Sequence, residues 1–197
     1  MPTFNFPNII NEKNLIDFSL FSVINNTTAN DEILVKNLEA SDNVINYIIR
    51  TMGWNGYKKT IDGIERIGYS NVTPSDLDSN GLTEDTSYTI WIGYFKDKER
   101  RFKKLLPIDT LSQSQYDGLL SLYWFTNTID YIGNAQRQFR ILDFIKEKKW
   151  DHLCTAMILG GAKRTQRQAE SKIIMLADYG QYKDRSLIKE QGIQQLL

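Results

Sequence analysis

The 197-residue sequence has one cysteine and one histidine, and these two shortages exclude several classes of protein. A single thiol, Cys154, cannot form an internal disulfide, so the core must stabilise the fold. Cys154 lies among apolar residues in the segment HLCTAMIL, which predicts a buried, unreactive thiol. His152 follows Asp151 at a predicted helix start, where we expect a surface position instead of a metal or general-base role. No helix can supply two His or two Cys ligands, so we expect neither a zinc site nor any other cofactor.

The sequence also lacks an excess of either charge, because 24 Lys and Arg balance 24 Asp and Glu. A net charge of zero gives no global field for nucleic acid or an anionic membrane, so we expect neither as a partner. No apolar run approaches the ~20 residues of a membrane span. The N-terminus MPTFNFPNII lacks the basic and apolar regions of a signal peptide. We therefore expect synthesis and folding in a cytoplasm.

What the sequence does contain is organised in three parts. Residues 1–40 hold eight asparagines and short apolar clusters without a helical stripe. This pattern predicts an irregular or partly extended N-terminal arm that packs against something. Residues 41–180 read as one folded domain, which is a length sufficient for a real core. Residues 181–197 form a C-terminal tail.

The first part of the domain, residues 41–81, predicts one helix followed by a small sheet. Ser41 is a good N-cap for a helix that continues to Met52. Strands are predicted over 57–61 and 64–69, joined as a hairpin by an Asp-Gly turn. This region forms a small lobe.

The second part, residues 82–180, predicts a helical lobe. Thr83 caps a long helix that Pro107 stops, and Ser112 with Gln115 forms a capping box that opens an apolar helix. Further helices are predicted over 136–148, 150–159 and 164–179. The fold class is therefore α+β, mainly α.

Four segments of the domain resemble the phage-type lysozymes, the muramidases of tailed bacteriophages. LSQSQYDGLLSLYWFTNTI (111–129) is similar to that family's central helix, usually written L-x-x-x-Q-[FY]-D-A-L. FRILDFIKEKKWDHLCTAMI (139–158) and GGAKRTQRQAESKIIMLADYG (160–180) resemble its next helices. GIERIGYSN (63–71) resembles its sheet motif, G-x-x-T-I-G-Y-G-H. The resemblance implies a lysozyme-like fold over 41–180: an N-terminal helix, a small antiparallel hairpin sheet and a helical C-terminal lobe.

The resemblance also assigns catalytic positions, and this sequence departs from the family at each of them. Met52 stands where the family has its glutamic acid, Lys59 where it has its aspartate, and Arg66 where it has its threonine. Ser70 and Asn71 replace the family's second glycine and its histidine. The sequence is shorter near Lys59, so the alignment leaves open whether Asp62 takes the aspartate position.

These departures remove the chemistry that the family needs. Cleaving a glycosidic bond takes a protonated acid and a negative group or activated water near the sugar. A thioether cannot donate a proton, so Met52 ends general-acid catalysis. Glu65 and Asp62 are the candidates for a relocated acid, but a strand residue and a turn residue are the simpler interpretations. We therefore assign no catalytic residue, no cofactor-binding residue and no metal ligand.

Two further clusters have both a structural and a functional interpretation. Lys163, Arg164 and Arg167 gather at a predicted helix start, either as a structural feature or as a patch for an acidic partner or phosphate. The helical spacing of the aromatic side chains indicates a core, with a sugar-stacking platform as the alternative. That aromatic set is Trp91, Tyr123, Trp124, Phe125 and Trp150.

The sequence as a whole predicts a degenerate lysozyme-like domain that serves as a structural or adaptor protein of a phage virion, in the tail or baseplate. Its expected partners are other virion proteins, held through the N-terminal arm. One alternative is an active muramidase (tail lysozyme) with a relocated acid. Others are a non-cleaving peptidoglycan-binding module and an unrelated helical partner-binding protein, which a structure without the small sheet would favour.

Overall fold

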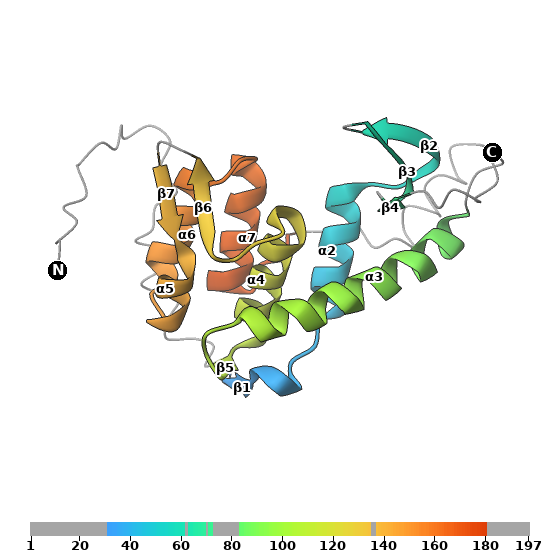
Figure 1. The fold of residues 1–197 in the computed structure, drawn as a ribbon. Coiled ribbons are helices and arrows are strands. Elements are labelled where there is room, and N and C mark those ends of the chain that lie inside the picture. The colour runs from blue at the N-terminus through green and yellow to red at the C-terminus, as the bar shows by residue number, and fades with distance from the viewer. Residues whose placement is uncertain (1–30, 62, 70, 73–82, 135–136, 181–197) are drawn as a thin grey trace. The chain divides into compact units, whose positions relative to one another are not determined.

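The computed structural model describes residues 31–61, 63–69, 71–72, 83–134 and 137–180, and from Glu32 onward these belong to one compact unit (Figure 1). Residues 1–30 of the expected arm (1–40) and the expected tail over 181–197 lie outside the described residues. Residues 32–40, the last part of the expected arm, pack with the folded unit, since Val35 and Leu38 are buried in its core.

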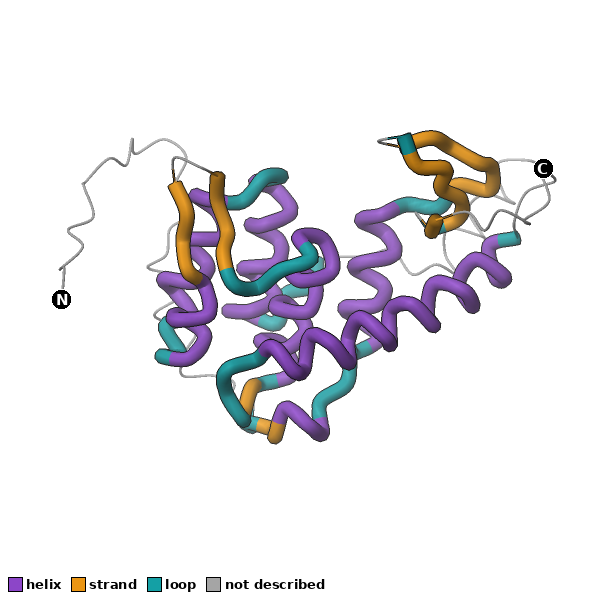
Figure 2. Tube along the Cα trace, in the orientation of Figure 1, coloured by secondary structure: helices purple, strands orange, loops and turns teal. Residues whose placement is uncertain are grey.

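The element order confirms the α+β, mainly α fold class (Figure 2). The helices are α2 (Asp42–Met52), α3 (Glu84–Leu105), α4 (Gln113–Thr126), α5 (Ile141–Lys146), α6 (Trp150–Gly160) and α7 (Arg164–Leu176), with a 3-10 helix η1 (Val35–Asn37). The strands are β1 (Ile33–Leu34), β2 (Asn55–Ile61), β3 (Ile64–Gly68), β4 (Asn71–Val72), β5 (Thr110–Leu111), β6 (Tyr131–Asn134) and β7 (Arg137–Arg140).

Local capping sets the start of three helices where the sequence predicts it. The Ser41 hydroxyl accepts from the Val44 amide at the start of α2, and the Thr83 hydroxyl accepts from the Thr86 amide at the start of α3. Ser112 opens α4 with a complete capping box. Each cap satisfies an amide that the helix itself leaves without a partner.

The small sheet lies between α2 and α3 in the chain and has the order β2-β3-β4. β2 and β3 pair antiparallel, with Thr60 opposite Glu65 and Lys59 opposite Arg66. Gly63 occupies the turn with a φ of 76°, a conformation that glycine adopts readily. β4 is an additional short strand, paired with β3. The structure contains the small sheet between helices, so it lacks the feature that would favour an unrelated helical partner-binding protein.

The core of the helical lobe is centred on α4. Most of this helix is buried, and it packs closely against α7, which in turn packs against α6. Gly118 permits the close approach, because a Cβ there would lie 3.1 Å from the Glu170 carbonyl oxygen and nearer still to Cγ1 of Ile174. Trp91 and Phe95 extend the core along α3.

One prediction for this lobe is wrong: residues 131–134 and 137–140 form two paired strands, where a helix from residue 136 was expected. β6 and β7 pair antiparallel with Ile132 opposite Phe139, and the following helix, α5, begins only at Ile141. The hairpin packs against the end of α6, since a Cβ at Gly160 would lie 2.9 Å from the Phe139 ring. The last helix was predicted over 164–179 and is shorter in the structure. It ends at Leu176, because Ala177 takes a left-handed conformation.

Two buried carboxylates fasten the chain that leads into α2. Asp117 of α4 accepts hydrogen bonds from the Ser41 amide (3.2 Å), the Ser41 hydroxyl (2.5 Å), the Gln113 amide group (2.9 Å) and the Tyr179 hydroxyl (2.6 Å). Burial raises the pKa of Asp117, while these hydrogen bonds act in the opposite direction.

Glu99 of α3 is the second of these carboxylates. It accepts hydrogen bonds from the Ala40 amide and the Tyr116 hydroxyl, each at 2.7 Å. Together with Asp117, it holds residues 40 and 41 and so fixes the direction in which α2 leaves the core.

Candidate functional site

The position that the resemblance assigns to the catalytic acid is held by Met52, the last residue of α2. The helix ends there because Gly53 turns the chain with a φ of 70°. Met52 is half-buried, and its Sδ accepts a hydrogen bond from the indole N–H of Trp124, at 3.2 Å. The side chain is therefore held against α4 as part of the packing.

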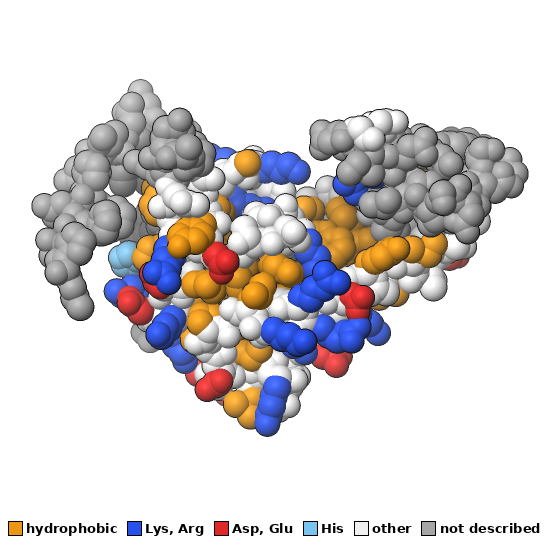
Figure 3. All heavy atoms as spheres, in the orientation of Figure 1, with side chains coloured by type: hydrophobic (Ala, Val, Ile, Leu, Met, Phe, Trp, Pro, Cys, Tyr) orange, Lys and Arg blue, Asp and Glu red, His pale blue; other side chains and the backbone are white. Residues whose placement is uncertain are grey.

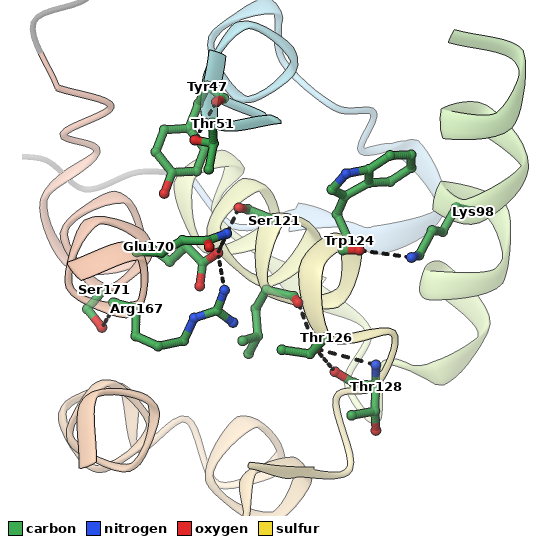
Figure 4. A network of polar contacts seen from close by, with 12 residues as sticks. Tyr47, Thr51, Lys98, Ser121, Trp124, Thr126, Thr128, Arg167, Glu170 and Ser171 are labelled. Atoms are coloured by element: carbon green, nitrogen blue, oxygen red, sulfur yellow. Dashed lines mark hydrogen bonds and ion pairs between the residues drawn. The ribbon is translucent and has the colours of Figure 1, made fainter. Parts of the chain in front are cut away.

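Lys98 of α3 supports Trp124 from the other side. Its Nζ donates a 2.9 Å hydrogen bond to the Trp124 carbonyl oxygen and lies 4.9 Å from the centroid of the indole ring (Figure 4). Burial, and then repulsion from Arg101, lower the pKa of Lys98. The indole that contacts Met52 is thus itself fixed by a cation.

The other two assigned positions, Lys59 and Arg66, are directly paired across β2 and β3. Two residues that carry positive charge therefore occupy neighbouring positions in the sheet. Arg66 is half-buried. Of the family's remaining sheet positions, Ser70 lies outside the described residues and Asn71 opens β4.

The two candidates for a relocated acid remain predictions. Asp62 lies outside the described residues, and Glu65 is paired with Thr60 in the hairpin ladder. Each is placed by the sequence in or beside the turn between β2 and β3.

The buried carboxylates of the described residues have structural roles. Asp117 and Glu99 hold the start of α2, as described above. Glu170 of α7 is fully buried, and its Oε1 accepts from the Ser121 hydroxyl (3.0 Å) and the Arg167 guanidinium (2.9 Å) (Figure 4). Burial raises the pKa of Glu170 to about 7 despite Arg167 nearby. Such a pKa suits an acid catalyst, but a fully buried group cannot reach a polysaccharide.

The predicted basic cluster divides in two. Lys163 and Arg164 are exposed, whereas Arg167 is only 2% exposed and forms a buried ion pair with Glu170. Arg167 therefore cannot contribute to a surface patch, and the structural interpretation is confirmed for it. Among the described residues, Arg167 Nε and Nη1 and Glu170 Oε2 have no hydrogen-bond partner.

The predicted burial of Cys154 and the predicted surface position of His152 are confirmed. Cys154 is fully buried, and burial raises the pKa of its thiol to about 12, so the reactive thiolate is not formed near neutral pH. His152 is exposed at the start of α6, where its Nδ1 lies 3.0 Å from the Asp151 carboxylate.

The aromatic set belongs to the core, as expected. Trp91 is fully buried and stacks with Phe95 at a centroid distance of 4.9 Å, and Tyr123 is buried as well. Trp124 lies at the edge of this cluster, 5.4 Å from Trp91. The remaining two, Phe125 and Trp150, are half-buried and pack against the core.

The described ranges contain neither a candidate metal site nor a candidate membrane span. No group of three or more His, Cys, Asp or Glu side chains is placed there to hold a metal ion. No helix in those ranges is long and apolar enough to cross a membrane.

No protein-family model and no curated protein matches the sequence. The fold, however, matches solved structures. The endolysin of Escherichia coli O157:H7 phage FAHEc1 aligns with a TM-score of 0.59 and 14% identity, over 74% of this chain and 98% of that one. The chain has a lysozyme-like fold.

Two further structures have the same fold. The muramidase domain of SpmX from Asticaccaulis excentricus aligns with a TM-score of 0.55 and 15% identity, over 71% of this chain and 99% of that one. A variant of the phage P22 lysozyme gives a TM-score of 0.53 and 19% identity, over 70% and 98%. Nearly the whole of each lysozyme-like chain is therefore represented here, which confirms the fold that the sequence motifs predict.

The sequence did not predict that the indole of Trp124 contacts Met52 at the position assigned to the catalytic acid. Trp124 was interpreted as a core residue, and its indole N–H turns out to contact Met52 across 72 residues of chain. The helical spacing of aromatic residues indicates burial but not the direction of a polar atom, so no sequence signal identified this contact.

Proposed function

We propose that the protein is a non-catalytic component of a phage virion, in the tail or baseplate, in which the lysozyme-like domain serves as a packing and docking unit. The observation that carries this proposal is the Met52–Trp124 contact at the end of α2. The place of a general acid is filled there by a thioether that takes part in packing.

The chemistry of the position supports the proposal. Protonation of a glycosidic oxygen needs an acidic proton, which Met52 lacks. The transition state also carries developing positive charge, and Lys59 and Arg66 lie at paired positions in the adjoining sheet. A cation about 5 Å from that charge costs about 3 kcal/mol at an effective dielectric near 20, or roughly two orders of magnitude in rate.

The phage setting is supported by the fold comparisons and by the chain's own extra segments. Structures with this fold include phage endolysins. This chain adds residues at its N-terminus that carry apolar clusters, which suit contacts with neighbouring proteins. In this proposal, other virion proteins are the partners and the host cytoplasm is the place of synthesis.

An assay of the full-length protein on purified peptidoglycan tests the loss of catalysis. We expect no release of soluble fragments between pH 4 and 9, with an active phage endolysin as the positive control. Turnover that disappears on Glu65→Gln or Asp62→Asn would instead support the relocated-acid alternative. Mass spectrometry of purified particles tests the virion location, and detection in the infected-cell lysate alone would contradict it.

A second candidate function, peptidoglycan binding without cleavage, is favoured by Trp54. This side chain is 46% exposed and follows Gly53 directly at the end of α2. Exposed aromatic rings provide an apolar face with a polar N–H, which suits the stacking of sugars. Sedimentation with cell-wall sacculi tests this function: Trp54→Ala should release the protein, while Tyr131→Ala, which changes a side chain of equal exposure, should not.

A further inference from the structure

A groove of about 840 Å³ lies along the second half of α3 and the segment that contains β1 and η1. This groove is separate from the position of Met52, which does not line it. Five cationic side chains line the groove, against the two carboxylates of Asp97 and Asp109. The cations are Lys36, Arg100, Arg101, Lys103 and Lys104. Figure 3 shows Lys and Arg side chains gathered along this part of the molecule.

Most of this positive charge is not neutralised within the described part of the chain. Arg100 forms an ion pair with Asp97, and Lys103 lies over the ring of Tyr116 at 5.8 Å. Lys36, Arg101 and Lys104 are exposed and form no ion pair with any described residue. The groove therefore presents a positive surface, although the protein as a whole has no net charge.

The groove is also partly apolar. Leu34, Leu106 and Ile108 line it, and Leu34 is 43% exposed. Aromatic side chains, on which nucleic-acid bases would stack, do not line it. A surface that combines free cations with aliphatic side chains fits a polypeptide with acidic and aliphatic residues better than a nucleic acid.

We infer that this groove docks a short extended segment of a neighbouring protein in which acidic and aliphatic residues alternate. The residues of α3 that line the groove, from Asp97 to Lys104, span roughly 11 Å at 1.5 Å per residue. An extended peptide of about four residues covers the same length. Acidic side chains on one face would meet Arg101 and Lys104, and aliphatic side chains on the other face would meet Leu34.

The test uses the full chain and a fluorescein-labelled peptide of eight alternating glutamate and leucine residues, with fluorescence anisotropy as the measurement. Arg101→Glu with Lys104→Glu should weaken binding at least about tenfold, because two attractive contacts become repulsive. Arg164→Glu with Lys172→Glu makes the same change in net charge on exposed positions of α7 and should alter binding less than about twofold. Leu34→Ser should weaken binding without changing its salt dependence.

Four results would overturn the inference: unchanged binding by the Arg101–Lys104 variant, equal weakening by both double variants, equal binding of a serine–leucine peptide, or stronger binding of a DNA duplex than of the acidic peptide. The inference rests on the proposed docking role but fails separately from it. Peptidoglycan turnover would refute the non-catalytic role and leave the groove untouched. Unchanged peptide binding by the Arg101–Lys104 variant would refute the groove and leave the non-catalytic role standing.

Discussion

The indole N–H of Trp124 donates a hydrogen bond to the sulfur of Met52, which joins the C-terminal part of α4 to the last residue of α2. Because Lys98 fixes the backbone and ring of Trp124, this contact is part of a connected set that spans α2, α3 and α4. A glutamate at position 52 would exchange a soft, half-buried sulfur for a charge beside an apolar cluster. The contacts of Met52, Trp124 and Lys98 therefore stabilise the packing of α2, α3 and α4.

Restoring the acid alone should not restore hydrolysis. We expect Met52→Glu to show no turnover of peptidoglycan and a lower melting temperature than the wild-type protein, because positions 59 and 66 still carry positive charge. The triple variant Met52→Glu, Lys59→Asp, Arg66→Thr should release soluble fragments at a measurable rate. Its control is the same variant with Met52→Gln, which has the shape of the acid without its proton. Equal activity in the single variant and in the triple variant would contradict the electrostatic argument.

The stability of the protein should fall as the pH rises through the range in which Glu170 titrates. Its pKa is about 7 in the folded protein against an ordinary value of 4.5, so the folded state binds the proton more tightly than the unfolded state. This contribution is complete below about pH 4.5 and is lost by a few kcal/mol as the pH passes about 7. Chemical denaturation at pH 5 and pH 8 measures the difference.

The variant Glu170→Gln isolates this effect, because it keeps the shape of the side chain and removes the titration. We expect a smaller loss of stability between the two pH values than in the wild-type protein. An unchanged pH dependence in Glu170→Gln would show that another group is responsible.

Gly118→Ala should destabilise the protein by about 1–3 kcal/mol, because the added methyl group would overlap with Ile174 where α4 and α7 pack. Gly93→Ala is the matched control. Gly93 lies inside α3, is exposed, and a Cβ there would meet nothing within 4 Å. The control should be stabilising by about 0.5–1 kcal/mol through helix propensity. Thermal unfolding measures both, and effects of the same sign would contradict the packing argument.

Cys154 should report on global unfolding. Its thiol is fully buried with a pKa of about 12, so we expect negligible labelling by a thiol reagent at pH 7 under native conditions. Labelling should become rapid in denaturant, at the same midpoint as the loss of helical circular dichroism. Fast labelling of the native protein would show that α6 opens locally, a result that the packing of Cys154 does not predict.

The parts of the fold that could be predicted from the sequence depend on short-range chemistry. Ser41, Thr83 and Ser112 cap helices through contacts within a few residues, so their roles are visible in the sequence. The β2–β3 hairpin likewise follows from its turn at Gly63. The resemblance of the motifs to lysozymes also predicted how these elements are arranged: an N-terminal helix, a small sheet and a helical lobe.

The features that were missed depend on contacts between distant segments. The segment QRQFR (136–140) contains good helix formers, yet residues 137–140 form a strand because Phe139 packs on Gly160 of α6 and pairs with Ile132. A structural role for Arg167 was one of the two interpretations of its cluster, but its complete burial could not be predicted from the sequence. Its burial follows from the approach of α7 to α4 at Gly118, which no local pattern reports.

The fastening of residues 32–41 bears on how this domain would respond to tension. A pull on the chain from its N-terminal side would load first the pairing of β1 with β5, then the Val35–Asp109 hydrogen bond, and next the bonds that Glu99 and Asp117 make with residues 40 and 41. These bonds lie in series ahead of α2. A force applied to the chain at residue 32 would therefore have to break these contacts before it reached α2.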